Sequence, residues 1–466
     1  MTKKTLTCAP RSAEEAAEIF RACGAAAAAG RRVRVGVVES PFWPPEGLAP
    51  EARSPHDFAL GGSGEAREIG TPGASNLARE IGAPGGSSVA REIESLGASD
   101  EALVLMSHAA MNEIQEISKR DYLAVVGGGV KFADLLAAAW GAGLYFPHEP
   151  DSLAREETVA RIIMDGTIFN TEGRFGSLRE YILALELVTP GGETIRTGSR
   201  SVKDVTGYDV AGFMMGSGAR CGMIARATIR LLPACRTRFP FACAGSAKLV
   251  DKFADVLHAN QMAAFLEIFE DRAARVLGER IGAAHAEAVS TILLVGELQG
   301  AGAGKERELF ERAKEIALAE LSIQRLDAGA LDAYRRFPSL ALDASGESRI
   351  LCVAYDSRPM AAKCFSAYNA MSLYPARRRN YFPLEALPEG LMAIISEAGE
   401  RVRVEMIERI DGRVARRRVG RGELKRILGS RAAGWPSEDE ARKSDPEALL
   451  AERLYRVFDP RGIMLQ

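Results

Sequence analysis

The feature that most constrains the fold is a stretch near the N-terminus that lacks the pattern of a helix or a strand. Residues 39–100 are rich in Pro, Gly, Ser and Ala and contain a twelve-residue repeat: AREIGTPGASNL (66–77), then AREIGAPGGSSV (78–89), then a third start at Ala90. Each unit is a short amphipathic piece broken by a Pro-Gly turn signal. Twelve residues are fewer than the usual solenoid repeats contain. The stretch therefore predicts a mobile or loosely packed insertion, and a partner-docking segment is the alternative.

Length, charge and cysteine usage limit the class of protein. The chain has 466 residues, enough for two or three domains, and its formal net charge of -2 gives no overall attraction to nucleic acid or acidic membranes. The seven cysteines form no C-x-x-C pair, which argues against a disulfide framework, a zinc site or an iron–sulfur cluster. No stretch reaches the roughly 20 apolar residues of a membrane span, and the N-terminus lacks an apolar signal core. We expect a cytoplasmic protein without a metal site.

The rest of the chain alternates between helical and extended patterns. Residues 12–30 predict a helix that begins at Ser12, and residues 32–38 alternate as a strand does. TPGGE (189–193) predicts a hairpin turn between two strands. After Pro233 longer strands and helices alternate, which favours an α+β layer with helices on one face of a sheet.

Near the C-terminus, Asp411-Gly412 between alternating runs predicts a further hairpin, and residues 446–458 predict a last helix. The basic strand that follows Gly412 lacks aromatic residues and has acidic neighbours, so a nucleic-acid site is not expected.

A polar loop between two apolar segments carries the strongest functional signal. SVKDVTGYDV (201–210) offers a cation at Lys203, an acceptor at Asp204, and a flat ring with a hydroxyl at Tyr208. Glycines allow backbone N–H groups to approach a pyrophosphate, and they stand at positions 207, 216, 218 and 222. The alternative is a buried turn in which Asp204 and Asp209 cap local backbone. The run GGGV (127–130) lacks the full G-x-G-x-x-G spacing and is expected to be structural.

Two segments carry a family resemblance. Residues 191–233 and the terminal LYRVFDPRGIM (454–464) resemble the FAD-binding oxidoreductases of the glycolate oxidase and D-lactate dehydrogenase type. Weaker similarity in GLYFPHEPDS (143–152) agrees with the proline-rich flavin-contacting turn of that family. The resemblance implies an α+β fold, with a two-part PCMH-type FAD-binding domain followed by a ferredoxin-like α+β cap domain that completes the substrate site.

The resemblance also implies a division of the chain. Residues 1–38 form the first part of the FAD domain, 39–100 the Gly/Pro/Ala-rich insertion, and 101–235 the second part of the FAD domain. Residues 236–440 form the cap or substrate domain, and 441–466 a C-terminal helix and tail.

FAD is the cofactor that the resemblance implies. The residues expected to line it are Pro147, Pro150, Asp151, Ser152, Gly173, Gly176, Lys203, Asp204, Gly207, Tyr208, Ser217, Gly222 and Ile224. The hypothesis requires a crevice for the isoalloxazine between the Tyr208 segment and the turn near Asp151, which side chains such as Ile163 and Phe169 must leave open. An ordinary inter-strand loop is the alternative for the proline turn.

The chain departs from the family at three places. The nearest substitute for its first phosphate loop is LGGSGEA (60–66), and bulky residues replace small ones in ARIIMDGTIF (160–169). The histidine-rich motif of catalytic cap domains is absent, since none of the five histidines lies after His285. The catalytic residues are thus unknown, and the candidates are His148, Arg336, Arg378 and Glu405, each with a structural role as the alternative. Cys221 is expected to be a packed thiol rather than a reactive one.

The resemblance implies a FAD-dependent oxidoreductase that oxidises a small 2-hydroxy acid, of the glycolate or D-lactate type, and passes electrons to a partner. The missing histidines leave two alternatives open. One is a non-catalytic or accessory flavoprotein subunit of a glycolate oxidase-like complex, paired with an iron–sulfur subunit and a second flavoprotein subunit. The other is a degenerate fold that acts only in protein interaction.

Overall fold

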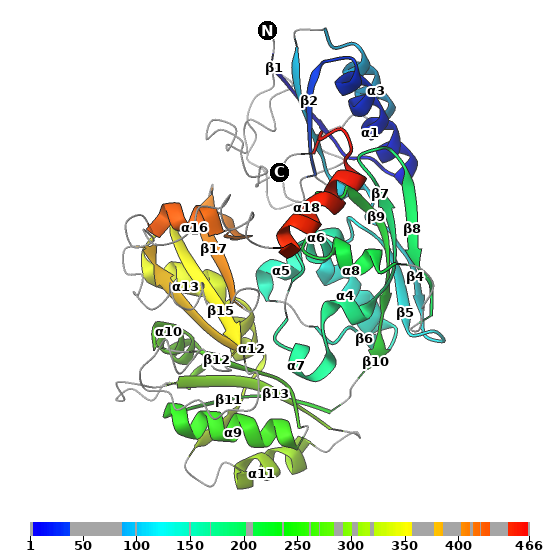
Figure 1. Ribbon diagram of the computed structural model, residues 1–466. Helices are drawn as coiled ribbons and strands as arrows, with labels where there is room; N and C mark the ends of the chain where they lie inside the picture. Colours follow the sequence, from blue (N-terminus) through cyan, green and yellow to red (C-terminus); the bar gives the residue numbers. More distant parts are fainter. Residues whose placement is uncertain are drawn as a thin grey trace, which may run out of the picture.

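The structure, a computed structural model, contains a three-stranded, a five-stranded, an eight-stranded and a two-stranded sheet among the residues that it describes (Figure 1). The described residues are 3–37, 86–97, 100–148, 151–167, 169–201, 208–234, 237–260, 262–269, 271–283, 292–300, 306–316, 321–356, 377–384, 402–410, 413–419, 421–428 and 446–464. Most of the repeat-containing stretch therefore lies outside the described residues. In the part of the chain that is described, no helix has the length and apolarity to cross a membrane.

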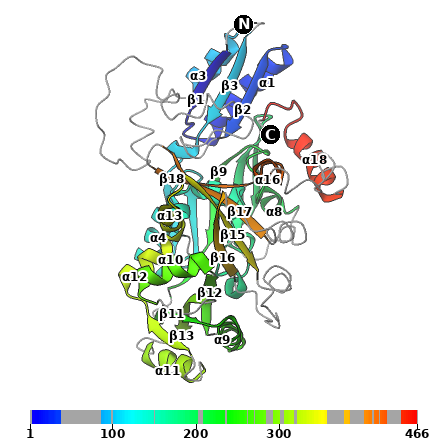
Figure 2. The same ribbon diagram turned by 90° about the vertical axis from the view of Figure 1, so that its left-hand side faces the viewer.

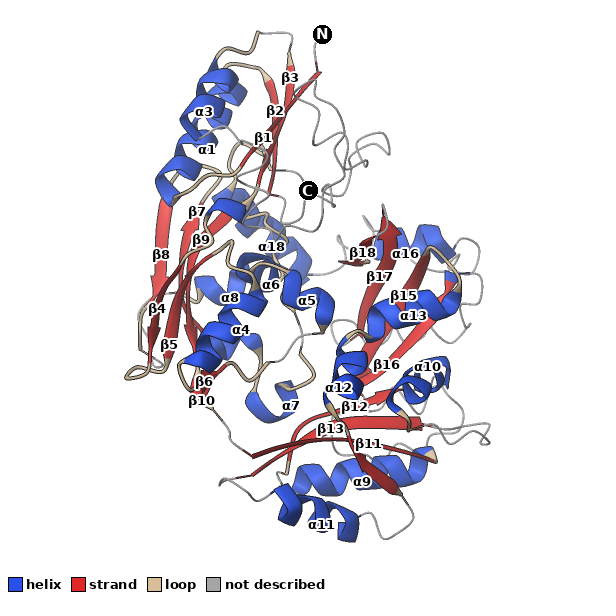
Figure 3. Ribbon diagram, turned by 180° about the vertical axis from the view of Figure 1, so that it is seen from behind, coloured by secondary structure: helices blue, strands red, loops and turns tan. Residues whose placement is uncertain are grey.

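The first unit, called the N-terminal unit, is a parallel sheet in the order β1-β3-β2 with two helices on one face (Figure 3). Its elements are β1 (Lys3–Cys8), α1 (Ala13–Ala28), β2 (Arg32–Val37), α3 (Gly86–Glu94) and β3 (Glu101–Met106). The helix predicted from Ser12 is confirmed, and the Ser12 side chain accepts a hydrogen bond from Glu15 N at 3.3 Å as its N-cap. The end of the chain completes this sheet, because Val35 N donates to Ile463 O at 2.7 Å.

The second unit, called the central unit, is an antiparallel sheet in the order β4-β5-β9-β7-β8. Its strands are β4 (Ile114–Ser118), β5 (Leu123–Gly127), β7 (Ile182–Val188), β8 (Thr194–Gly198) and β9 (Met223–Arg230), with the short pair β6 (Leu144–Tyr145) and β10 (Leu232–Pro233) beside them. The hairpin predicted at TPGGE is confirmed, because β7 and β8 pair antiparallel and Thr189 N donates to Glu193 O at 2.9 Å.

Helices gather on one side of the central sheet, toward the third unit (Figure 1). They are α4 (Phe132–Gly141), α5 (Ser152–Glu156), α6 (Val159–Met164), α7 (Glu172–Phe175), α8 (Val210–Met214) and α18 (Pro446–Phe458), with the 3-10 turns η2 (His108–Ala110) and η3 (Leu178–Tyr181). The predicted last helix is confirmed as α18, which lies beside α8 (Figure 2), where Phe458 stacks on Phe213 with ring centroids 5.5 Å apart.

The third unit, called the large-sheet unit, has eight strands in the order β14-β11-β13-β12-β16-β15-β17-β18. The strands are β11 (Thr237–Gly245), β12 (Ala263–Phe269), β13 (Ile292–Gly300), β14 (Ser322–Arg325), β15 (Arg349–Asp356), β16 (Arg377–Pro383), β17 (Val402–Ile410) and β18 (Arg413–Arg418). Its helices are α9 (Ala247–Ala259), α10 (Asp271–Ile281), α11 (Glu306–Ile316), α12 (Ala328–Arg335), α13 (Phe337–Ser345) and α16 (Arg421–Leu428). The predicted hairpin is confirmed in the antiparallel pair β17–β18.

The prediction of helices on one face of this sheet is wrong. In β12, Leu266 and Ile268 belong to the buried cluster of α9 and α11, whereas Phe265 and Phe269 belong to the cluster of α10 and α13 on the other face. Every residue of β12 is buried, and apart from Glu267 the strand is apolar, without the alternation of a half-exposed strand. That pattern indicates a sheet covered on both faces.

Candidate functional site

The turn that follows β6 places His148 in the interior rather than at an open site. The His148 ring is fully buried and stacks on Phe169, with centroids 5.0 Å apart, while Tyr181 meets it edge-on at 4.9 Å. Its Nδ1 lies 2.7 Å from Thr171 Oγ1. The imidazole therefore serves as a packed, hydrogen-bonded member of an aromatic cluster, and as a catalytic candidate it has no open face toward a substrate among the described residues.

Asp151, the next described residue of the turn, has two structural roles. One carboxylate oxygen accepts from Ala154 N at 3.0 Å and caps α5. The other accepts from Arg416 Nη1 at 2.8 Å, across to the large-sheet unit, and the Nε of Arg416 lies 3.9 Å from Glu405 Oε1. Burial disfavours the charged guanidinium, but the carboxylates of Asp151 and Glu405 outweigh it and raise the pKa of Arg416. The structure thus brings together a predicted cofactor residue and the catalytic candidate Glu405 through a cation that the sequence did not single out.

A second polar link joins the same two units. Asn170 Nδ2 donates to the Tyr334 hydroxyl at 2.5 Å, and that hydroxyl donates to Glu267 Oε2 at 2.7 Å. Glu267 is buried, so this link closes a hydrogen-bond chain in the interior between the units.

Two of the predicted cofactor glycines are required by internal packing. Gly222 has φ +116°, and a Cβ added there would collide with the Val188 carbonyl oxygen. Gly176 has φ +82°, a backbone conformation that requires glycine, and the atoms nearest to an added Cβ would be the movable carboxylate of Glu180. Neither position therefore indicates a cofactor by itself.

A buried histidine, His108, lies against Ile224 and the run GGGV, and the sequence did not predict a role for it. Its Nε2 accepts a hydrogen bond from Ile224 N at 3.1 Å. A Cβ at Gly128 or Gly129 would collide with the carbonyl oxygen of Ile224 or of His108. The prediction that GGGV is structural is confirmed. The local sequence feature that could have indicated His108 is the pair Ser107-His108 directly after a buried strand.

The polar loop is described only at its two ends. Tyr208 is 95% exposed, and Asp209 caps α8 by accepting from Gly212 N at 2.8 Å. Arg179 Nε lies 2.9 Å from both carboxylate oxygens of Asp209, and this hydrogen bonding lowers the pKa of Asp209. The alternative raised from the sequence, a buried turn capped by Asp204 and Asp209, is confirmed only for the cap by Asp209, because this end of the loop is exposed and Asp204 lies outside the described residues. Pro150, Lys203, Asp204 and Gly207 lie outside the described residues, as does the glycine run 60–66.

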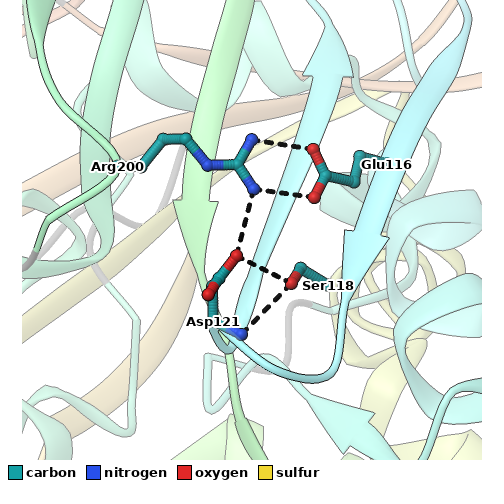
Figure 4. Close-up of polar contacts among 4 residues, drawn as sticks. All are labelled: Glu116, Ser118, Asp121 and Arg200. Atoms are coloured by element: carbon teal, nitrogen blue, oxygen red, sulfur yellow. Dashed lines mark hydrogen bonds and ion pairs between the residues drawn. The ribbon is translucent and has the colours of Figure 1, made fainter.

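An exposed ion-pair network holds the start of the same loop (Figure 4). Arg200 donates from both terminal nitrogens to Glu116 at 2.7 Å, and it also reaches Asp121 at 3.3 Å. Ser118 Oγ donates to Asp121 at 3.0 Å. The hydrogen bonds from Arg200 lower the pKa of Glu116. Those from Ser118 and Arg200 lower the pKa of Asp121. The network is open to solvent and fixes loop geometry rather than forming a closed site.

Two bulky residues of the stretch 160–169 lie in the core of the central unit. Ile163 is 1% exposed and shares one buried cluster with Ala211 and Met214 of α8. Phe169 is 4% exposed and stacks on both His148 and Phe132. Both are therefore core residues. Pro150 and residues 202–207 of the two expected walls lie outside the described residues, so the crevice between those walls stays a prediction.

The remaining candidates are not brought together. Arg336 lies at the surface and pairs with Asp332 at 2.8 Å. Arg378 lies in β16, and Pro147 and Ser217 are buried in the central unit.

Cys221 is fully buried, and burial raises the pKa of its thiol to about 12, which confirms a packed thiol. Ser152 begins α5, and Gly173 lies in α7.

Comparison with known proteins identifies the domain. Residues 82–198 match the family described as FAD binding domain. The chain is 32% identical over 136 residues to glycolate oxidase subunit GlcD of Bacillus subtilis, covering 29% of this chain and 28% of that protein. It is also 32% identical over 133 residues to D-lactate dehydrogenase of Archaeoglobus fulgidus (28% and 29%). A third relative, D-2-hydroxyglutarate dehydrogenase of Stutzerimonas stutzeri, is 32% identical over 184 residues (38% and 38%). The chain thus matches less than two fifths of the length of these relatives.

The fold has a counterpart among solved structures. An alkyldihydroxyacetonephosphate synthase structure superposes with a TM-score of 0.55, covering 98% of this chain and 76% of that chain at 10% identity. At that identity the likeness concerns the fold alone. The resemblance seen in the sequence is confirmed: residues 82–198 match the FAD binding domain, the chain is similar over part of its length to glycolate oxidase subunit GlcD and D-lactate dehydrogenase, and FAD is the cofactor that these matches support.

Proposed function

We propose that the chain is a FAD-dependent oxidoreductase that oxidises a small 2-hydroxy acid and passes the electrons to a separate partner. The observation that carries this proposal is the match of residues 82–198 to the FAD binding domain. The arrangement of a parallel N-terminal sheet, an antiparallel central sheet and a following large sheet supports it.

The substrate class comes from the relatives. Glycolate, D-lactate and D-2-hydroxyglutarate, named in three of them, all carry a hydroxyl group next to a carboxylate. The electron acceptor is proposed to be a separate protein, because the seven cysteines of this chain form no iron–sulfur motif. An iron–sulfur subunit and a second flavoprotein subunit in the cytoplasm complete the proposal.

The proposed cofactor contacts are the described residues of the proline turn and of the segment 173–176, together with those flanking the polar loop. Asp151 and Arg416 would hold the turn against the large-sheet unit, since their side chains are only 11% and 9% exposed. Glu405 lies beside this pair and is the catalytic candidate best placed at the contact between units. A proton acceptor near a substrate hydroxyl is the role that a carboxylate there would perform.

A second function, an accessory flavoprotein subunit without its own catalysis, is favoured by two observations. His148 of the proline turn is packed in an aromatic cluster with Phe169 and Tyr181, and no histidine follows His285. Such a subunit would bind FAD without reducing it with a hydroxy acid.

An absorption spectrum of the purified chain after incubation with FAD and gel filtration separates these functions. The proposed enzyme shows the visible bands of oxidised flavin, and anaerobic addition of glycolate, D-lactate or D-2-hydroxyglutarate bleaches them. Retained bands that none of the three acids bleaches contradict the enzyme and support the accessory subunit. Complete loss of flavin on the column contradicts both.

A further inference from the structure

Helix α18 carries apolar side chains that the core of the central unit does not cover. Tyr455 and Phe458 face that core and pack against it. Leu450, Leu454 and Val457 are 57%, 38% and 73% exposed, and they follow the helical spacing i, i+4, i+7. These three residues, named the outer stripe, form one row instead of being scattered singly, so they mark a candidate interaction surface.

The exposure of the outer stripe follows its position around the helix. At about 100° per residue, Leu454 lies about 70° from the side that faces the core, Leu450 about 110° and Val457 about 130°. The exposed fractions rise in the same order. Since α18 lies at the periphery of the central unit (Figure 2), the outer stripe is a lateral face of the helix that is open to a partner.

Two arginines border the outer stripe. Arg453 and Arg456 are exposed on α18, and within the part of the chain that the structure describes neither forms an ion pair. The carboxylate of Asp459, which directly follows α18, accepts hydrogen bonds from the backbone N–H groups of Ile463 and Met464 at 3.0 Å instead. An apolar row with two such cations beside it is complementary to an apolar ridge that carries carboxylates.

The positions of the arginines favour a protein helix over a second copy of this chain or a bilayer. Antiparallel two-fold pairing through the outer stripe sets Arg453 beside the same arginine of the other copy, and parallel pairing aligns the two helix dipoles. A flat bilayer meets Arg453 and Arg456 first, because they lie on the side away from the core. A helix alongside α18 covers the stripe and sets its own carboxylates against the arginines.

We propose that the outer stripe, with Arg453 and Arg456, is the docking site for an acidic amphipathic helix of a partner protein. The apolar side of that helix packs on Leu450, Leu454 and Val457, and its carboxylates pair with the two arginines. This site goes beyond the proposed oxidation, because docking there needs neither a flavin nor a hydroxy acid.

The test uses the full chain and three labelled synthetic peptides of about 15 residues, the length at which a single helix becomes stable. The acidic peptide has leucines at the spacing i, i+3, i+4, i+7 and glutamates beside them. The neutral peptide has glutamine in place of each glutamate, and the scrambled peptide keeps the acidic composition without the spacing. Binding is measured by fluorescence anisotropy.

We expect the acidic peptide to bind with a Kd below about 1 mM, and the other two at least about tenfold more weakly, since each lacks either the charges or the apolar row. Equal binding of the acidic peptide and either of the other two overturns the proposal, as does a Kd for the acidic peptide above about 1 mM.

Two pairs of substitutions locate the binding. Val457→Ser with Leu450→Ser removes the two more exposed members of the outer stripe and is expected to weaken the acidic peptide about tenfold. Arg453→Gln with Arg456→Gln is expected to weaken the acidic peptide about tenfold and to leave the neutral peptide unchanged. If either pair leaves binding of the acidic peptide unchanged, the proposal fails.

The matched control is Arg272→Gln with Arg275→Gln. These arginines are exposed on α10 of the large-sheet unit at the same spacing, i and i+3, so the control removes the same charge from a helix elsewhere. The control is expected to bind the acidic peptide as the unaltered chain does. Equal weakening by this control and by the α18 pair indicates a general charge effect and overturns the proposal.

Sedimentation velocity, and cosedimentation with vesicles of phosphatidylserine and phosphatidylcholine, test the other two occupants. The unaltered chain is expected to show the same sedimentation as the variant Val457→Ser with Leu450→Ser and to stay in solution beside the vesicles. Self-association or vesicle binding that this variant abolishes assigns the outer stripe to a second copy or to a bilayer, and overturns the proposal.

Discussion

Arg416 of strand β18 donates a hydrogen bond from Nη1 to Oδ2 of Asp151 at 2.8 Å, and so ties the large-sheet unit to the turn before α5. The pair is nearly excluded from solvent, and the carboxylate of Glu405 lies beside it, with Oε1 3.9 Å from Arg416 Nε. Removing the cation takes away the guanidinium that faces both carboxylates, which is the costly way to break a buried pair.

We expect Arg416→Met to lower the free energy of unfolding by about 3 kcal/mol, measured by urea denaturation. Asp151→Asn keeps the α5 cap but loses the ion pair. Asp151→Ala loses both, and its free energy of unfolding is expected to be about 1 kcal/mol lower than that of Asp151→Asn. The double variant Asp151→Asn with Arg416→Met is expected to be more stable than the sum of the single changes predicts. Additive effects would show that the two side chains do not interact in solution.

Phe169 fills the interior beside His148, so its truncation is expected to open a cavity. Phe169→Ala should destabilise the protein by roughly 3 to 5 kcal/mol, again by urea denaturation. Phe175→Ala is the matched control: Phe175 is only half-buried, makes an edge contact with Tyr145 at a centroid distance of 6.4 Å, and is expected to cost roughly 1 kcal/mol. Similar costs for both variants would contradict the core position of Phe169.

The same variant also tests the proposed flavin site. Phe169 packs on His148 of the proline turn, a proposed wall of that site, so Phe169→Ala enlarges the space beside it and is expected to retain more FAD through gel filtration than the unaltered chain. Retention that stays the same or falls would indicate that the ring binds away from this cluster.

Asp209 is expected to titrate below its ordinary pKa of about 3.9, because Arg179 and Gly212 N bind its ionised form. A lowered pKa in the folded state means that the stabilisation is complete above the unfolded pKa and is lost as the pH falls through the folded one. The α8 cap should therefore persist at neutral pH and weaken only in strong acid. A carboxyl ¹³C NMR titration measures the midpoint, and Arg179→Met should raise it; a midpoint at or above the ordinary value contradicts the pairing.

Cys8, Cys23, Cys221 and Cys243 are expected to resist alkylation in the folded protein. Burial raises the pKa of each thiol to about 12, so almost no thiolate forms at pH 8. Iodoacetamide labelling followed by peptide mass mapping should leave these four unmodified, and the same treatment in urea should label all of them. Rapid labelling of Cys221 in native conditions would restore the hypothesis of a reactive thiol.

Elements with strong local signals were predictable from the sequence. Ser12 and Glu15 marked the start of α1, TPGGE marked the β7–β8 turn, and Asp411-Gly412 stood between two alternating runs that do pair as β17 and β18. Each signal depends on residues within a few positions of one another, where turn and capping chemistry act.

The candidate site was harder to predict because its residues meet only in the fold. Asp151 and Arg416 are 265 positions apart, and neither has a neighbour that indicates the other. Gly176 and Gly222 were expected to approach a cofactor, yet the same absence of a side chain serves close packing against Glu180 and Val188. His108 sits behind Ile224 without any motif, since a single buried histidine leaves no periodic pattern.

The bond between Val35 and Ile463 has a consequence for the order of assembly. During synthesis, the segment that pairs with the edge of β2 is made more than four hundred residues after the strand itself. The N-terminal unit therefore gains this contact only after the central and large-sheet units have been made, and until then the edge of β2 is exposed to pairing with other chains in the cell.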